Sequence, residues 1–289
     1  MINRREIIGA GVAYGTLLSV PSYAQAPNAT AGSFDQLLEK AIETDQVALG
    51  RDLRERQEYE LFEYAGKGID RRPLSSTKLS KRSADMIVAF EVTSKNAYER
   101  KYKAPIWPHG ASGVTIGIGY DVGYVTKSWL HEDWDASGIP PRQIAELERA
   151  CELTGRAAEA ILPTLSGIDI PWASAIQQFN NFVLPRYTAE TLAALPKLGK
   201  LVQGNIDCVG ALVSLTYNRG ASFSRETDRY REMRAIRRHA DDERWDAIPE
   251  EIRKMQRLWK TPDGRPIPNM AGLLTRRELE AKLFEEGLK

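Results

Sequence analysis

The stretch from Tyr102 to Tyr124 constrains the fold most strongly, because it cannot form a helix. It holds five glycines and two prolines in 23 residues, and this composition is typical of turns and short strands. On both sides of it the apolar residues follow helical spacing, in the segment that ends near Glu91 and again from Lys127 onward. The sequence therefore predicts an α+β, mainly α protein. A small β element is expected directly after the helix that carries Glu91, followed by a C-terminal helical lobe.

Apolar spacing and capping residues place the expected helices. Ser83 is the expected N-cap of the helix that delivers Glu91 near its C-terminal end. A long helix is expected from Phe34 to about Tyr64. Further helices are expected at 141–162, 172–184, 188–198, 205–218, 226–239, 243–258 and 271–286, with prolines such as Pro185 separating them.

The first 26 residues have the pattern of an export signal. Arg4 and Arg5 precede an apolar stretch of about 14 residues, which is too short to cross a hydrocarbon layer of about 30 Å. The stretch ends in the small-x-small sequence Ala24-Gln25-Ala26. We expect an exported, periplasmic or extracellular protein without a membrane anchor after cleavage, and the arginine pair suits either a general secretory or a twin-arginine signal. The expected organisation is a signal at 1–26, a tether, helix and connector at 27–79, and one catalytic-type domain at 80–289.

Charge and cysteine usage exclude several classes of protein. Lys and Arg number 40 and Asp and Glu number 39, a balance that argues against a dedicated nucleic-acid binder. Three histidines and two cysteines show no metal-ligand spacing, so no metal site is expected. Cys151 and Cys208 could form one bridge in an oxidising compartment, but the favoured interpretation is two buried thiols. The oligomeric state cannot be inferred.

The eight residues from Val114 to Asp121 alternate between apolar positions and small or polar positions. In a strand, the second face would carry Thr115, Gly117, Gly119 and Asp121. Positions without side chains let a bulky polymer lie close to the backbone. Six residues of straight strand span about 20 Å, so Thr115 and Asp121 can serve one bond only if the chain bends at one of the glycines.

Hydrolysis of a glycosidic bond needs an acid for the leaving oxygen and a base for water, with the two carboxyls about 6.5–9.5 Å apart in inverting enzymes. Glu91, at a helix end among apolar neighbours, is the candidate acid because partial burial favours its protonated form. Asp121, on the glycine-lined face, is the candidate base, and Thr115 could hold the water. Taken singly, Glu91 could be an ordinary surface residue, Thr115 an ordinary strand residue and Asp121 an Asx-turn residue. Their occurrence within one 31-residue stretch predicts a site.

Three blocks of sequence carry a family resemblance. The run from Thr115 to Gly119 resembles the threonine–glycine signature that follows the catalytic glutamate of phage-type (glycoside hydrolase family 24-like) lysozymes, most closely in the pesticin muramidase domain. Residues 211–220, which end in Asn-Arg-Gly, and residues 272–280, Gly-Leu-Leu-Thr-Arg-Arg-Glu-Leu-Glu, are similar to two later helices of that superfamily. The resemblance covers residues 80–288. It implies a lysozyme-like fold and a muramidase that cleaves the β-1,4 bond between N-acetylmuramic acid and N-acetylglucosamine in peptidoglycan glycan strands, without metal or organic cofactor.

By position, the resemblance makes Glu91 the general acid, Thr115 the residue that positions water, and Asp121, six residues after Thr115, the general base. Ordinary phage-type lysozymes instead place an aspartate nine residues after the glutamate. That position is Arg100 here, and Glu99, one residue earlier, is the alternative second carboxylate.

Residues near the expected groove are weaker candidates for binding substrate. They are Tyr120, Trp107, Gly117, Gly119 and Asn218, although capping of the helix before it is the favoured role of Asn218. Two other functions stay open. A lytic transglycosylase needs only one acid/base glutamate, and the departure at Arg100 suits a noncatalytic peptidoglycan-binding protein with a lysozyme-like shape.

Overall fold

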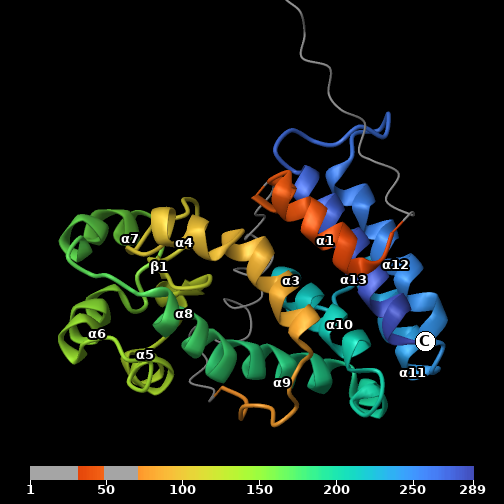
Figure 1. The fold of residues 1–289 in the computed structure, drawn as a ribbon, viewed down its shortest axis with the longest axis horizontal. Coiled ribbons are helices and arrows are strands. Elements are labelled where there is room, and N and C mark those ends of the chain that lie inside the picture. Colours follow the sequence, from red (N-terminus) through yellow and green to blue (C-terminus); the bar gives the residue numbers. More distant parts are fainter. Residues whose placement is uncertain (1–31, 49–70) are drawn as a thin grey trace, which may run out of the picture. The chain divides into compact units, whose positions relative to one another are not determined.

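Helices dominate residues 32–48 and 71–289, which are the residues that the computed structural model describes (Figure 1). The only sheet within these residues pairs β1 (Thr115–Ile116) with β2 (Tyr120–Asp121). The expected α+β, mainly α class is therefore confirmed. The predicted export signal lies outside the described residues.

Helix α1 (Phe34–Glu43) begins with a capping box, in which the Ser33 side chain accepts a hydrogen bond from the backbone of Gln36 and the Gln36 side chain accepts one from the Ser33 backbone. It ends far short of Tyr64, because the chain turns at Asp45, whose φ is +55°. A single 3-10 turn, η1 (Gln46–Ala48), follows. The expected helix is thus confirmed at Phe34–Glu43, but its expected continuation through residue 48 is wrong, and the rest of its range lies outside the described residues. Helix α1 and residues 71–289 belong to one compact unit.

Helix α3 (Lys81–Val92) starts three residues earlier than expected, because Ser80 and not Ser83 is its N-cap. The Ser80 hydroxyl accepts a hydrogen bond from the Ser83 backbone at 3.1 Å. Ser83 is instead buried against α10 (Ile206–Arg219), where a Cβ on Gly210 would lie 1.8 Å from its hydroxyl. Helix α4 (Lys95–Lys101) follows, so Glu91 lies near the C-terminal end of α3 as predicted.

Short helices follow the hairpin as far as residue 165. They are α5 (Lys127–Trp134), α6 (Pro141–Leu147), η3 (Glu148–Ala150), α7 (Arg156–Ile161) and η4 (Leu162–Leu165). The single helix expected at 141–162 is wrong: it breaks at Glu152 and Gly155, which have φ of +61° and +56°. The break lets Thr154 pair with Gly113 in an isolated antiparallel bridge beside the hairpin.

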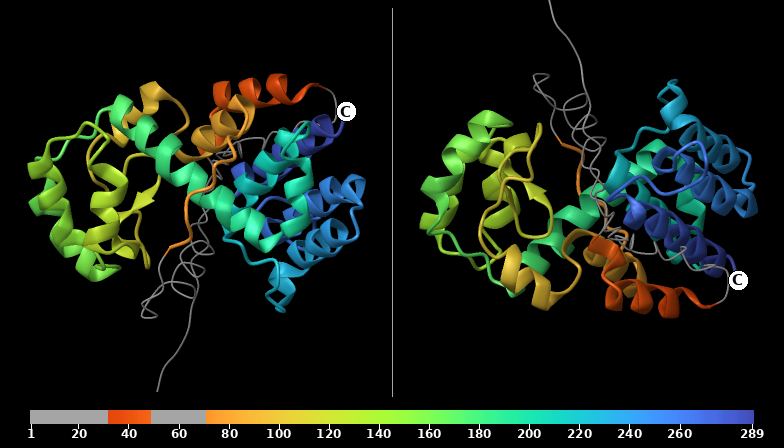
Figure 2. Two further views of the ribbon diagram at one scale, coloured as in Figure 1. Left: turned by 90° about the horizontal axis from the view of Figure 1, so that it is seen from below. Right: turned by 90° about the horizontal axis from the view of Figure 1, so that it is seen from above.

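One continuous helical segment replaces the two expected around Pro185. Helix α8 (Trp172–Gln178) passes through a π-helical turn, η5 (Phe179–Val183), into α9 (Leu184–Ala194). Pro185 lies in the first turn of α9, where its missing N–H is tolerated. The predicted boundary at this proline is therefore wrong. In Figures 1 and 2, α8 and α9 run between the α4–α7 group with the hairpin and the helices of residues 206–287.

Helix α10 (Ile206–Arg219) forms the centre of the C-terminal group, because every residue from Cys208 to Arg219 is buried. It packs against α3, α9 and α13 (Ala271–Gly287). The expected helices at 205–218 and 271–286 are confirmed within about two residues. The remaining elements are η6 (Pro196–Leu201), η7 (Asp228–Tyr230), α11 (Arg231–Asp241), η8 (Trp245–Ala247), α12 (Ile248–Lys254) and η9 (Met255–Trp259).

Both cysteines are free and buried. Burial raises the pKa of Cys151 to about 11 and that of Cys208 to about 12. The favoured interpretation of two buried thiols is thus confirmed.

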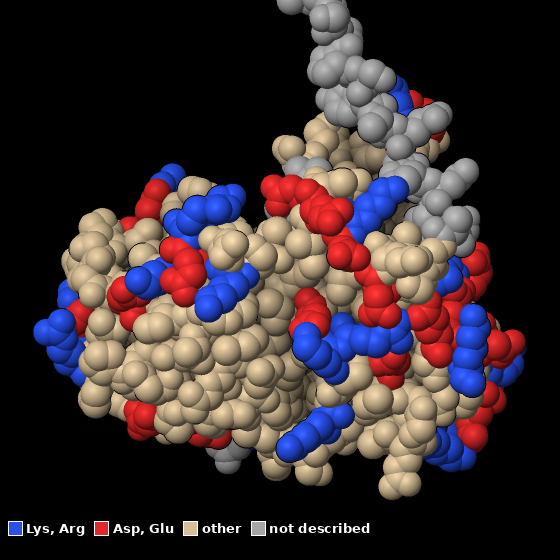
Figure 3. Space-filling model, in the orientation of Figure 1, with Lys and Arg blue, Asp and Glu red and all other residues tan. Residues whose placement is uncertain are grey.

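Surface charge follows the near-zero balance of the sequence. On the face shown in Figure 3, acidic and basic side chains are intermixed and do not form a large patch of one sign. Within the described residues, no helix has both the length and the apolarity needed to span a membrane.

Candidate functional site

The β hairpin brings Thr115 directly opposite Asp121. These two residues are paired across the antiparallel strands, as are Ile116 and Tyr120. Gly117 and Gly119 have φ of +57° and +71°, which close the turn between the strands. The straight strand with alternating faces is therefore wrong, but the glycine bend that would bring Thr115 and Asp121 together is present.

Two backbone N–H groups hold the Asp121 carboxylate. Gly113 donates to Oδ2 at 3.1 Å and Gly123 donates to Oδ1 at 2.9 Å. A Cβ on Gly113 would lie 2.3 Å from Asp121 Oδ1 and 2.4 Å from the Gly123 nitrogen, so this close approach requires glycine. Asp121 thus caps the short helix η2 (Val122–Tyr124) as an Asx-turn residue would, and donors of this kind stabilise a charged carboxylate.

Thr115 presents a buried hydroxyl beside this carboxylate. Its backbone is paired with Ile106 on the other side, with N–H···O distances of 2.8 and 3.0 Å. Its Oγ1 makes no hydrogen bond within the described part of the chain. A buried hydroxyl without a partner costs about 1–3 kcal/mol, and such groups in native proteins call for an explanation.

Glu91 lies at the end of α3 with 5% of its surface exposed. Its Oε1 accepts a hydrogen bond from Arg276 Nη1 of α13 at 3.2 Å. Glu91 therefore forms a buried ion pair with Arg276. The apolar surroundings that the sequence indicated are only part of the environment of this carboxyl.

Arg276 belongs to a buried network that joins distant parts of the sequence. It contacts Glu280 Oε1 at 3.3 Å, and its Nη2 donates to the Ser214 carbonyl at 3.1 Å. Arg277 donates to Glu280 Oε1 at 2.9 Å and to Asn218 Oδ1 at 3.0 Å. Of the three blocks that carry the resemblance, residues 115–119 belong to the hairpin, and residues 211–220 and 272–280 meet in this network.

Asn218 has a different role from the one expected. It lies within α10 and its amide faces Arg277, while Gly220, at φ +70°, ends the helix. The favoured capping role of Asn218 is therefore wrong.

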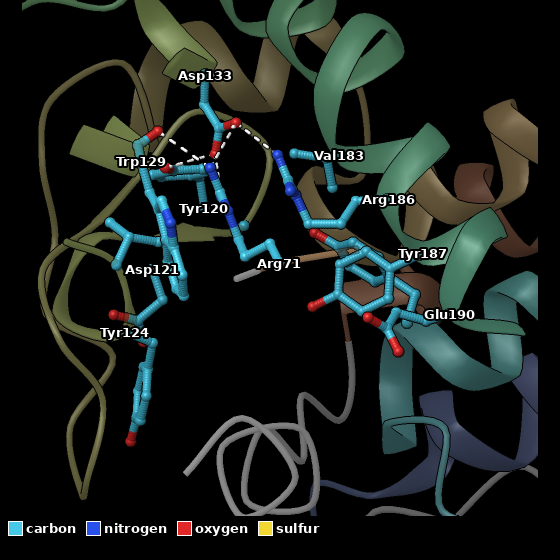
Figure 4. A pocket seen from close by; sticks show the side chains of 13 residues that line it. Arg71, Tyr120, Asp121, Tyr124, Trp129, Asp133, Val183, Arg186, Tyr187 and Glu190 are labelled. Carbon is cyan, nitrogen blue, oxygen red and sulfur yellow. Dashed lines mark hydrogen bonds and ion pairs between the residues drawn. The ribbon is translucent and has the colours of Figure 1, made fainter. Parts of the chain in front are cut away.

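A pocket of about 690 Å³, counted with the solvent at its mouth, opens beside the hairpin. In Figure 4, Tyr120, Asp121, Tyr124 and Trp129 lie on one side of it and residues of α9 on the other. It is lined by Arg71, Gly119, Tyr120, Asp121, Tyr124, Val125, Trp129, Asp133, Val183, Arg186, Tyr187, Glu190 and Tyr217. Aromatic faces with a few polar groups are typical of ligand-binding pockets.

Asp133 is the centre of a charged cluster at one end of the pocket. Its Oδ2 accepts hydrogen bonds from Arg71 at 2.7 Å and from the Tyr120 hydroxyl at 2.8 Å. Its Oδ1 accepts from Arg186 at 2.7 Å and from Arg71 at 3.2 Å. Arg71 also lies over the Trp129 ring at 4.5 Å. Burial, assisted by the Asp133 charge, raises the pKa of Tyr120 well above its ordinary value.

The pocket gathers some of the predicted residues and not others. Asp121, Tyr120 and Gly119 line it. The Trp107 indole instead donates to the Ser112 carbonyl at 3.0 Å. A Cβ on Gly117 would lie 2.9 Å from the Trp134 ring, so this glycine serves packing in the turn.

The alternative second carboxylate lies elsewhere on the chain. Glu99 is exposed on α4 and does not line the pocket, whereas Asp121 does. Neither Glu91 nor Thr115 lines this pocket, although Thr115 is paired with a residue that does.

Sequence reasoning missed Arg71, Arg186, Tyr187 and Glu190, which all line the pocket. Arg71 belongs to a segment interpreted as a connector. The other three, with Val183, follow the i, i+3, i+4, i+7 spacing of one helix face. This helix face can be recognised in the sequence only if the helix is assumed to continue through Pro185.

A family model described as a domain of unknown function (DUF8812) matches residues 87–187. The matched range contains Glu91, the hairpin, Asp133 and the start of α9. No match is found among curated proteins. Within the described residues, no group of three or more His, Cys, Asp or Glu side chains is arranged to hold a metal ion.

Proposed function

We propose that this protein is an exported muramidase with a lysozyme-like fold, which hydrolyses the β-1,4 bond between N-acetylmuramic acid and N-acetylglucosamine in peptidoglycan. The observation that carries the proposal is the hairpin pair. It sets a carboxylate at the edge of an aromatic pocket beside a buried hydroxyl that has no partner within the described residues. These two groups are what is needed to hold and deprotonate a water molecule.

In the proposed reaction, Glu91 donates its proton to the glycosidic oxygen as the bond between that oxygen and the anomeric carbon breaks. Asp121 takes a proton from a water held by Thr115, and the water oxygen bonds to the anomeric carbon from the opposite face. The configuration of that carbon inverts, and both carboxyls exchange their protonation states. Solvent then restores them.

Arg276 is proposed to orient Glu91 for this step. Its side chain is itself fixed by Ser214 and Glu280, so the Glu91 carboxyl has a rigid support.

The test measures release of reducing ends from purified peptidoglycan by the mature protein. Glu91→Gln keeps an acceptor for Arg276 but cannot donate a proton, and we expect it to lower the rate at least about 1000-fold. Glu99→Gln is the matched control, because this glutamate is exposed on the next helix, and we expect it to keep the wild-type rate. Full activity of Glu91→Gln, or equal losses in both variants, would contradict the proposal.

Mass spectrometry of the products separates hydrolysis from the transglycosylase reaction. A hydrolase gives a reducing N-acetylmuramic acid end, whereas a transglycosylase gives an anhydro sugar. We expect the reducing product and a loss of rate of at least about 100-fold in Asp121→Asn. An anhydro product, with activity that survives in Asp121→Asn, would show the transglycosylase reaction instead.

A further inference from the structure

The Arg71–Asp133–Arg186 cluster carries more positive charge than its own carboxylate neutralises. Two arginines share Asp133, whose side chain is 1% exposed. Asp133 already accepts four hydrogen bonds, from the two arginines and Tyr120. Glu132 also contacts Arg71, but its side chain is 54% exposed, so water and salt screen it.

Arg186 also has donors to spare. Arg186 lines the pocket, and among the described residues it makes a single hydrogen bond, through Nη2 to Asp133. A guanidinium has five N–H donors.

The other acidic residues that line the pocket, Asp121 and Glu190, lie away from this cluster. Figure 4 shows Asp121 and Glu190 on opposite sides, apart from the guanidinium of Arg186. Glu190 contacts Arg72 Nε at 3.3 Å, which offsets its charge. The pocket therefore has one cationic end, and the remainder combines aromatic rings with carboxylates.

We propose that Arg186, supported by Asp133 and Arg71, binds a carboxylate of the glycan substrate. This inference rests on the proposed function and names the feature of the substrate that the pocket selects. N-acetylmuramic acid differs from N-acetylglucosamine by a lactyl ether that ends in a carboxyl, and peptides attached there carry further carboxylates. An arginine held by a buried aspartate presents its remaining donors in a fixed plane, which suits a carboxylate. The site would separate peptidoglycan from uncharged polymers of N-acetylglucosamine.

The test is calorimetric binding of a soluble disaccharide-peptide from peptidoglycan, with its carboxyls free or capped as methylamides. We expect wild-type protein to bind the free form about tenfold more tightly, and Arg186→Gln to bind both forms equally. Arg186→Lys should keep part of the preference, because it retains the charge and loses the planar fork. Arg237→Gln on α11, an arginine exposed outside the pocket, should retain the full preference.

A peptide-free disaccharide, free or methyl-esterified at the lactyl carboxyl, identifies the group that is bound. A preference for its free form assigns the lactyl carboxyl, and a preference seen only with the peptide present assigns the peptide. Either result supports carboxylate recognition. Equal binding of free and capped ligands by wild-type protein, no binding of any of them, or a preference that survives in Arg186→Gln would overturn it.

Release of reducing ends, measured in parallel, keeps the two proposals separate. Cleavage without a carboxylate preference would refute the inference and leave the muramidase function. Preference without cleavage would support the inference and refute that function.

Discussion

Substitution of Gly113 by alanine tests the hairpin geometry, on which the proposed base depends. The new methyl group would lie 2.3 Å from Asp121 Oδ1 and 2.4 Å from the backbone of Gly123. Backbone atoms cannot move aside cheaply, so the strand pair must separate. Overpacking of this kind costs about 1–3 kcal/mol, and loss of the hydrogen bond from Gly113 to the carboxylate adds about 1 kcal/mol or more.

We therefore expect Gly113→Ala to lower the free energy of unfolding by about 2–4 kcal/mol, which corresponds to a fall of roughly 4–16 °C in Tm. Activity should fall further than stability accounts for, because Asp121 loses the backbone donor at position 113. Gly167→Ala is the control, since a Cβ there meets nothing within 4 Å. Thermal unfolding and reducing-end release should be measured for both variants. Equal Tm values in the two variants would refute the reasoning.

Three further changes test other features. Thr115→Val should leave stability unchanged or raise it slightly, because it removes a buried hydroxyl without a partner in the described residues. We expect the same change to lower the cleavage rate about 10–100-fold. A loss of stability above about 2 kcal/mol in urea unfolding would count against this. Arg276→Met should lower the free energy of unfolding by about 3–5 kcal/mol in the same assay, because the buried carboxylates of Glu91 and Glu280 lose their shared partner. A loss under about 1 kcal/mol would show that the two carboxylates do not depend on Arg276. Hydrogen bonds that the His131 ring donates to the carboxylates of Glu148 and Asp135 raise the pKa of His131. Its stabilising contribution is therefore present below the unfolded pKa of about 6.5 and is lost as pH rises through the raised value. The Tm of wild-type protein should therefore fall relative to His131→Gln between about pH 6 and pH 8, and parallel profiles would contradict it.

Local patterns in the sequence predicted the local parts of the site. The apolar stripe of α3 placed Glu91 at a helix end, and the distance argument on a straight strand required the bend that Gly117 and Gly119 make. Both inferences depend on residues within one turn or one hairpin. Backbone geometry of this kind is encoded over a few residues, and a single chain shows it directly.

Contacts between distant residues could not be read in the same way. Asp133 and Arg71 are 62 residues apart, and each resembles an ordinary surface charge when read alone. Arg276 meets Glu91 across 185 residues. The helix through Pro185 was missed for a different reason, because a π turn accommodates a proline that ordinary helix rules treat as a boundary.

The π turn η5 also fixes how α9 meets the pocket. Such a turn contains one residue more than an α-helical turn, and each residue of a helix rotates the chain by about 100°. Deletion of a single residue there, for example Asn181, would remove the extra residue and swing Arg186, Tyr187 and Glu190 together around the helix axis. A single residue in the middle of a helix thus sets the orientation of the α9 side of the pocket. An insertion or deletion at this point would therefore alter ligand preference more than many substitutions on the surface.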